Sequence, residues 1–151
     1  MLNQSIPDFE IEASCGTKFR PSQYAGHVLV LYFYPKDSTP GCTLEGQQFR
    51  DLHPEFAKTN AFIFGISRDS LKSHQNFKSK QCFPFELLSD PEELACHLFG
   101  VIKMKNMYGK QVRGIERSTF VVDAGGVIRC ESRGVKVDGH AQAVLNFIKT
   151  L

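Results

Sequence analysis

The stretch HVLVLYFYPKDSTPGCTLEG, residues 27–46, joins the most apolar run of the chain to a turn that contains a single cysteine. His27–Tyr34 is short, rich in β-branched and aromatic residues, and bounded by Gly and Pro, which predicts a buried strand. After the turn, apolar side chains recur at helical spacing, which predicts a helix over Thr43–Lys58. Cys42 is therefore expected between the end of a buried strand and the start of a helix.

The rest of the sequence predicts alternating strands and helices in one α/β domain that spans residues 1–151. Further strands are expected over Ala61–Ser67, Phe85–Leu88, Ser118–Val122 and Val127–Glu131, and further helices over Asp69–Lys80, Pro91–Phe99 and Asp138–Leu151. Pro54 lies inside the helix that follows Cys42, and we expect it to kink this helix or to divide it in two. The turn at Asp123–Gly126 predicts a hairpin, so the sheet should be mixed and flanked by helices.

Composition and charge exclude several classes of protein. The net charge of +2 is too small to indicate a nucleic-acid partner or an anionic membrane. No apolar run approaches the roughly 20 residues that span a bilayer, and the N-terminus lacks the pattern of a secretory or transit signal.

Cysteine usage indicates a reducing compartment, and we expect the cytoplasm. The chain has five cysteines. Their odd number and irregular spacing argue against a disulfide framework. They are Cys15, Cys42, Cys82, Cys96 and Cys130. No CxxC pair occurs, which argues against a structural zinc site and against a thioredoxin-type redox pair.

The residues around Cys42 indicate a reactive thiolate. Free N–H groups and the positive end of the dipole at a helix start stabilise an anion, and a thiolate is one. Gly41 allows an incoming group to approach the backbone, Pro40 stiffens the turn, and Pro35 fixes the exit of the strand. The hydroxyl of Thr39 can donate to the sulfur or to a bound oxygen. The alternative is an inert, buried cysteine with Thr39 as a helix cap.

The same residues carry a resemblance to a known family. The pattern Pro35-x-x-x-Thr39-x-x-Cys42 matches the active-site motif of the peroxiredoxins, and PKDSTPGCTLEG closely resembles their bacterioferritin comigratory protein group, also called PrxQ. The strings IPDFEI, GISRDSLKSHQNF, FPFELLSD and IERSTFVVDAGGVI extend the resemblance over almost the whole chain. It implies a thioredoxin-like fold and a thiol peroxidase that needs neither metal nor cofactor.

The resemblance also implies roles for individual residues. Cys42 would be the peroxidatic nucleophile, Thr39 would orient the peroxide, and Pro35 would shield the pocket from water. The N–H groups of Gly41 and Cys42 would help to hold the peroxide oxygens. Arg117 matches the active-site arginine, and a cation beside the sulfur would favour the thiolate and support the leaving oxygen. Otherwise Arg117 would be a surface arginine at a strand end.

Glu45 also matches a position of the family. A glutamate just inside the start of a helix is in addition favourable to the helix dipole alone, so its role is held open between the two.

The sequence departs from the family at the resolving cysteine. The commonest resolving position falls on Gln47, and that of a second subgroup lies near Lys78, so neither supplies a thiol. Cys82 is the nearest substitute, although a bond to Cys42 would require local unfolding. A one-cysteine mechanism is the main alternative, and Cys96 is more simply a small buried side chain. The reductant would be thioredoxin, glutaredoxin or a small thiol, and the resemblance favours a monomer.

Two other classes are weighed against the peroxidase. A thioredoxin-like disulfide exchange protein would need the missing second cysteine of a CxxC pair. An interaction module would use the abundant Phe residues, which are more simply core. The histidines do not cluster as metal ligands do, and His27, His53 and His140 are expected at solvated element ends.

Overall fold

A computed structural model describes residues 1–151 and shows a central sheet of seven strands with helices on both faces. The strands of this sheet are β1 (Ile11–Ala13), β2 (Lys18–Phe19), β3 (Val28–Phe33), β4 (Ala61–Ser67), β5 (Leu87–Ser89), β8 (Ser118–Val122) and β9 (Ile128–Arg133). The helices are α1 (Pro40–Lys58), α2 (Leu71–Gln81), α3 (Leu94–Leu98) and α4 (His140–Ile148), and a 3₁₀ turn covers Pro21–Tyr24. None of these helices has the length and apolarity to cross a membrane.

The sheet is mixed, as the sequence predicts. Its strand order is β2-β1-β5-β4-β3-β8-β9, with β3, β4 and β5 parallel to one another and β8 antiparallel to β3. Because β8 runs back along β3, Ser118 at the start of β8 pairs with Phe33 at the end of β3. This register brings the link before β8 to the same edge of the sheet as the start of α1.

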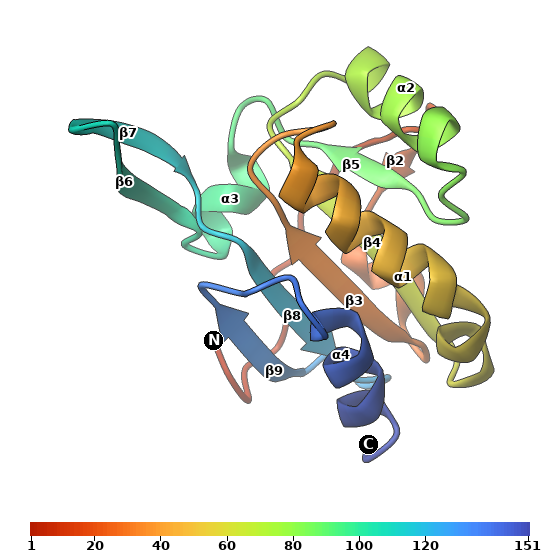
Figure 1. The fold of residues 1–151 in the computed structure, drawn as a ribbon. Coiled ribbons are helices and arrows are strands. Elements are labelled where there is room, and N and C mark those ends of the chain that lie inside the picture. Colours follow the sequence, from red (N-terminus) through yellow and green to blue (C-terminus); the bar gives the residue numbers. More distant parts are fainter.

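Strand β3 separates two apolar cores, which explains its continuous apolar sequence. Alternate residues point to opposite faces of a strand, and a strand covered on both faces needs apolar residues at every position. Leu29, Leu31 and Phe33 pack with α3 on one face. On the other face the side chains of β3 pack with α1, α2 and α4, which lie together in front of the sheet in Figure 1.

Helix α1 is one continuous element of 19 residues, so the expectation that Pro54 divides it was wrong. Pro54 is exposed, and the carbonyl that loses its donor can be solvated there. The helix begins at Pro40, earlier than expected, with Thr39 as its N-cap residue. Cys42 is therefore inside the first helical turn.

Two other helices are shorter than predicted because left-handed residues precede them. Glu93 has φ +62°, and α3 begins only after it, whereas the prediction began at Pro91. Gly139 has φ +72°, and α4 begins at the next residue instead of at Asp138.

The main feature missed from the sequence is a separate hairpin that projects from the body of the protein (Figure 1). It pairs β6 (Ile102–Met107) with β7 (Lys110–Ile115) through a two-residue turn. Tyr108 and Gly109 both have positive φ values, +53° and +78°, as the favoured two-residue hairpin turns require. The x-Gly pair between two alternating segments was the signal that could have revealed it.

Candidate active site

Cys42 lies in the first turn of α1, directly beyond the end of β3, and its side chain is buried with 2% of its surface exposed. The N–H of Thr43 bonds to the carbonyl of Thr39, at 2.9 Å. The N–H groups of Gly41 and Cys42 have no hydrogen-bond partner in the protein. The first turn thus offers two free donors beside the sulfur, which suits a thiolate or a bound oxygen.

Arg117 reaches the sulfur from the short link between β7 and β8. Its Nη2 donates to Cys42 Sγ at 3.5 Å, and its side chain is only 16% exposed. The surface alternative for this arginine is therefore wrong. The position follows from sheet register, because the pairing of Phe33 with Ser118 places residue 117 beside the end of β3.

The second terminal nitrogen of the Arg117 guanidinium is bonded to Glu45. Its Oε1 accepts a hydrogen bond from Arg117 Nη1 at 2.5 Å, whereas its Oε2 has no partner. Burial raises the pKa of Glu45 from an ordinary 4.5 to about 7, although the charge and hydrogen bond of Arg117 oppose this rise. Burial acts to lower the pKa of Arg117, but Glu45 and Cys42 raise it above its ordinary value, so the guanidinium stays charged.

Thr39 and Pro35 lie on the loop that precedes α1, and both are half-buried. The hydroxyl of Thr39 donates to the carbonyl of Lys36 at 2.8 Å and does not cap the helix. Its proton is thus engaged, and the oxygen is left to accept a hydrogen bond. Of the two donations that the sequence allowed for this hydroxyl, to the sulfur or to a bound oxygen, the one to the sulfur is not formed.

The guanidinium of Arg117 approaches the backbone closely at Gly41. A Cβ atom added there would lie 3.2 Å from Arg117 Nη2, which is tighter than ordinary packing. A side chain at position 41 would therefore require Arg117 to shift by a few tenths of an ångström from its present position beside Cys42.

A further residue of the site region was not recognised from the sequence. His140, at the start of α4, is not solvated as expected: its Nε2 lies 2.7 Å from Thr119 Oγ1. Burial, together with the charge of Arg117, lowers the pKa of His140 to about 4, so the ring is neutral at pH 7. Nothing in the sequence near residue 140 signals this, because the neighbours come from distant elements.

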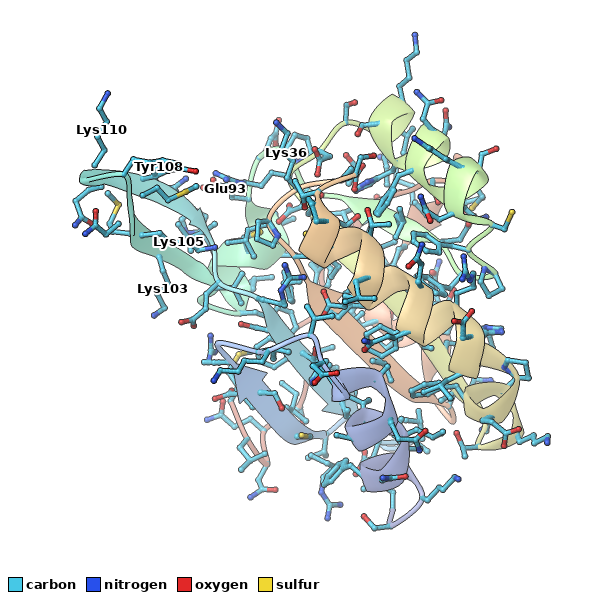
Figure 2. All side chains as sticks on the ribbon, viewed as in Figure 1. Lys36, Glu93, Lys103, Lys105, Tyr108 and Lys110 are labelled. Atoms are coloured by element: carbon cyan, nitrogen blue, oxygen red, sulfur yellow. The ribbon has the colours of Figure 1, made fainter.

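The projecting hairpin carries several basic side chains, of which Lys110 lies at its outer end (Figure 2). Lys103, Lys105 and Lys110 lie on it, and Tyr108 at its tip is fully exposed. Burial and the charge of Arg117 lower the pKa of Lys105, whereas the charge of Cys42 acts in the opposite direction. The amine of Lys105 donates to the Ile115 carbonyl, which holds it at the base of the hairpin.

The five cysteines are all free, and their surroundings differ. Cys82 follows the last residue of α2, has φ +55° and is exposed. Cys96 is fully buried, and burial raises its pKa well above the usual range, as befits a packing residue. Cys15 is exposed and lies beside Thr17, and Cys130 is half-buried and lies beside Ser132.

The end of α2 that carries Cys82 is packed on α1. The ring of Phe83 fills the space over Gly46, where an added Cβ would lie 2.3 Å from it. The side chains of Gln47 and Gln81 are hydrogen-bonded at 3.0 Å, and Arg50 donates to the carbonyl of Gln81 at 2.9 Å. Cys82 thus flanks the part of α1 just beyond Cys42, including the position that the commonest resolving cysteine would occupy.

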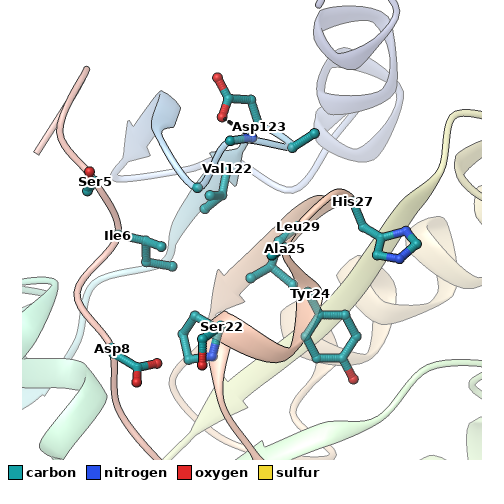
Figure 3. Close-up of a pocket in the computed structure, with 14 residues that line it drawn as sticks. Ser5, Ile6, Asp8, Ser22, Tyr24, Ala25, His27, Leu29, Val122 and Asp123 are labelled. Atoms are coloured by element: carbon teal, nitrogen blue, oxygen red, sulfur yellow. Dashed lines mark hydrogen bonds between the residues drawn. The ribbon is translucent and has the colours of Figure 1, made fainter.

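Two other features lie outside this site. A cavity of about 270 Å³ at the opposite end of β3 is lined by residues such as Tyr24, His27 and Asp123, and it contains none of the predicted site residues (Figure 3). Asp37 and His74, with Asp69, bring possible metal ligands within 4.8 Å of one another. Both ring nitrogens of His74 are already bonded to protein oxygens, so hydrogen bonds alone account for the cluster.

The geometry above is that of a thiol peroxidase with a thioredoxin-like fold, and comparisons with known proteins agree. Residues 2–131 match the model of the AhpC/TSA family. A peroxiredoxin Bcp of Xanthomonas campestris is 57% identical over 142 residues, which cover 94% of this chain and 89% of that protein. A peroxiredoxin Bcp of Bacillus subtilis is 45% identical over 150 residues, with 99% and 96% coverage.

Solved structures support the same assignment. The bacterioferritin comigratory protein of X. campestris superposes with a TM-score of 0.90 at 56% identity, over 94% of this chain and 90% of that one. A variant of PrxQ from Xylella fastidiosa gives a TM-score of 0.94 at 44% identity, over 99% and 96%. The chain therefore belongs to the AhpC/TSA family, and within it to the peroxiredoxins of the Bcp/PrxQ group. It is a thiol peroxidase.

The raised pKa of Glu45 makes a prediction about stability. A carboxyl group whose pKa is higher in the folded chain contributes stability below pH 4.5 and loses it as pH rises through 7. Glu45→Gln cannot ionise, so the free energy of unfolding of the wild type minus that of the variant should fall by up to about 3 kcal/mol between pH 4 and pH 8. Urea unfolding of the reduced proteins measures this difference, and a constant difference over that range would contradict the burial of an ionisable Glu45.

Gly41→Ala tests the close approach of Arg117. The added methyl group should displace the guanidinium from the sulfur. Complete loss of a well-placed donor slows such reactions roughly a hundred- to a thousand-fold, so this partial displacement should slow the reaction by about tenfold or more. Stopped-flow measurement of the reaction with H2O2 should show this decrease with little change in the melting temperature. Gly114→Ala is the matched control, because its Cβ would make only ordinary contacts at 3.9 Å or more. Equal rates in the two variants would show that the approach at Gly41 does not matter.

Proposed function

We propose that Cys42 is the peroxidatic nucleophile of this thiol peroxidase and that Arg117 is the cation that activates it. The observation that carries the proposal is the contact of Arg117 Nη2 with Cys42 Sγ, at 3.5 Å, at a helix start with free N–H groups. A fixed cation and aligned backbone donors favour the thiolate, which is the reactive form of cysteine. Both would act in a buried site, where electrostatic interactions are strong.

The reaction follows from this arrangement. The thiolate of Cys42 attacks the terminal oxygen of the hydroperoxide, an S–O bond forms and the O–O bond breaks. The OH group stays on sulfur as the sulfenic acid, and the departing alkoxide takes up a proton to leave as the alcohol or as water. Arg117 would stabilise the negative charge as it moves from the sulfur to the departing oxygen.

The loop residues would position the peroxide. Because the hydroxyl of Thr39 donates to the Lys36 carbonyl, Thr39 Oγ1 is suited to accept a hydrogen bond from the O–H group of the hydroperoxide. The free N–H groups of Gly41 and Cys42 can donate to its oxygens. Together they would align the O–O bond with the sulfur, which is the main source of rate in such a reaction. Pro35 would limit the access of water from the strand side.

The substrates would be hydrogen peroxide and organic hydroperoxides. The Xanthomonas relative has been studied for alkyl peroxide reduction, and its similarity over nearly the whole chain supports organic substrates here. No metal or other cofactor is required by this chemistry.

The sulfenic acid would be reduced through Cys82 or an external thiol, with thioredoxin, glutaredoxin or a small thiol as the final reductant. Cys82 is exposed, flanks α1 and follows a helix end, where fraying costs little. Cys42 is buried, so the first turn of α1 would have to unwind for the two sulfur atoms to meet. Free cysteines suit the cytoplasm, and a monomer suffices because one chain supplies the whole site.

Cys42→Ser should abolish peroxide consumption and leave the fold intact. Serine is nearly the same size, but its hydroxyl is not ionised at neutral pH. The test is H2O2 and organic hydroperoxide consumption with dithiothreitol as reductant, with circular dichroism to check the fold. Cys15→Ser, which alters an exposed thiol away from the site, is the control and should keep full activity. Turnover in Cys42→Ser would overturn the assignment of the nucleophile.

Cys82→Ser separates the two routes of resolution. If Cys82 resolves, this variant should still form the sulfenic acid but should lose both the Cys42–Cys82 disulfide and cycling with thioredoxin. Mass mapping of disulfides after one equivalent of peroxide detects the bond in the wild type. A wild type in which Cys42 carries only an external thiol or a sulfinic acid would show that Cys82 is not the resolving residue.

A further inference from the structure

Outside the reacting residues, one buried aspartate–histidine pair lies at the base of the loop that carries the site. The carboxylate of Asp37 is buried and accepts three hydrogen bonds. Tyr34 donates its hydroxyl to Oδ1 at 2.6 Å, and Ser73 donates to Oδ2 at 2.8 Å. The Nδ1 of His74 lies 2.7 Å from the same Oδ2, and neither ring nor carboxylate is appreciably exposed. The pair joins the loop before α1 to the first turn of α2.

The hydrogen-bond partners of His74 indicate where the protons of this pair lie. His74 Nε2 is 2.9 Å from the carbonyl oxygen of Leu88, which can only accept, so Nε2 carries a hydrogen. The other ring nitrogen faces a carboxylate oxygen, so a second proton lies between His74 and Asp37. The contact is therefore a short, buried hydrogen bond, and it is costly to break because it would leave a buried polar group without a partner.

The backbone of Asp37 is held as well. Its N–H donates to Asp69 Oδ2 at 2.9 Å, and this oxygen also accepts the hydroxyl of Ser67 at 2.5 Å. Asp37 is thus fixed through its main chain and side chain to the end of β4 and the start of α2. No other residue of the loop from Pro35 to Thr39 has as many bonds to distant elements.

These bonds at Asp37 help to maintain an unusual backbone conformation at the next residue, Ser38. Ser38 has φ +62°, in the left-handed region that non-glycine residues rarely adopt. Such a conformation persists only where the surroundings over-determine it. On one side Ser38 is bounded by Asp37 with its four bonds, and on the other by Thr39, the N-cap residue of α1. The strained residue lies four positions before Cys42.

We propose that the Asp37–His74 pair is a latch that holds the Cys42 loop in its reactive conformation and must open before Cys42 is resolved. This rests on the proposed role of Cys42 as the nucleophile. While the latch is closed, Thr39 and the first turn of α1 are positioned for the attack on peroxide. Opening it releases the strain at Ser38, so that the sulfenic acid can leave its buried position.

The latch also links the two candidate thiols, because His74 belongs to the helix whose end carries Cys82. The closed state exposes the sulfenic acid to a second peroxide molecule, which adds one oxygen to give the sulfinic acid and leaves as alcohol or water. The open state exposes it to a thiol instead. The stability of the latch therefore sets the partition between over-oxidation and reduction.

Asp37→Ala, Asp37→Asn and His74→Gln test the latch. Hydrogen exchange at the amides of residues 36–43 should become at least tenfold faster in Asp37→Ala, with a smaller increase in Asp37→Asn, which keeps the size but not the charge. His74→Gln should resemble Asp37→Ala. The fraction of sulfinic acid formed in excess H2O2 should fall several-fold in the same order, and the first reaction with peroxide should slow.

A control separates a latch from a general loss of stability. Ile128→Ala removes a buried side chain from the opposite core, and urea can be adjusted until it and Asp37→Ala are equally stable. At equal stability the control should keep wild-type loop exchange and sulfinic acid formation. Equal changes in the control and in Asp37→Ala would overturn the proposal.

A rescue provides a second criterion. Glycine adopts positive φ without strain, so Ser38→Gly in the Asp37→Ala background should restore part of the peroxide reactivity and slow the loop exchange. If Ser38→Gly restored neither property, stored strain at Ser38 would be contradicted.

A further measurement needs no peroxide chemistry: hydrogen exchange of the loop is compared with and without Asp37→Ala in a Cys42→Ser chain. Faster loop exchange there would support the latch even if Cys42 proved not to be the nucleophile, and unchanged exchange would refute it.

Discussion

The contact between the Arg117 guanidinium and the Cys42 sulfur is the interaction on which the rest of the site depends. Two independent parts of the fold must meet to form it: the start of α1 after β3, and the link before β8. The register of β3 against β8 brings them to one edge of the sheet. The missing side chain at Gly41 and the carboxylate of Glu45 then fix the direction in which the guanidinium points.

The same contact explains the electrostatics of the site. A thiolate, a carboxylate and one guanidinium would leave a buried excess of negative charge, which is unfavourable in a medium of low dielectric constant. Burial raises the pKa of Glu45 to about 7, against the opposing charge and hydrogen bond of Arg117. The free N–H groups at the helix start favour the remaining negative charge on sulfur. On the proposed mechanism, the low exposure of Cys42, Glu45 and Arg117 keeps solvent from weakening these interactions.

The parts of the fold and site that could be predicted are those that local sequence determines. Strand β3, the turn and α1 follow from apolar periodicity and turn residues, and Arg117 followed from a motif. The bond between Asp37 and His74 could not be predicted, because its partners are 37 residues apart and meet only through packing. The neutral, half-buried His140 depends in the same way on distant neighbours, which a sequence pattern does not contain.

The most direct measurement of the central claim is the site of first oxidation. Reduced protein is treated with one equivalent of H2O2 in the presence of dimedone, and every cysteine is then mapped by mass spectrometry. Accessibility alone would favour the exposed thiols, Cys15 and Cys82. The account predicts that the buried Cys42 is modified first, as the dimedone adduct or within a disulfide, while Cys15 stays reduced. A sulfenic acid on Cys15 or Cys82 with Cys42 still a thiol would contradict it.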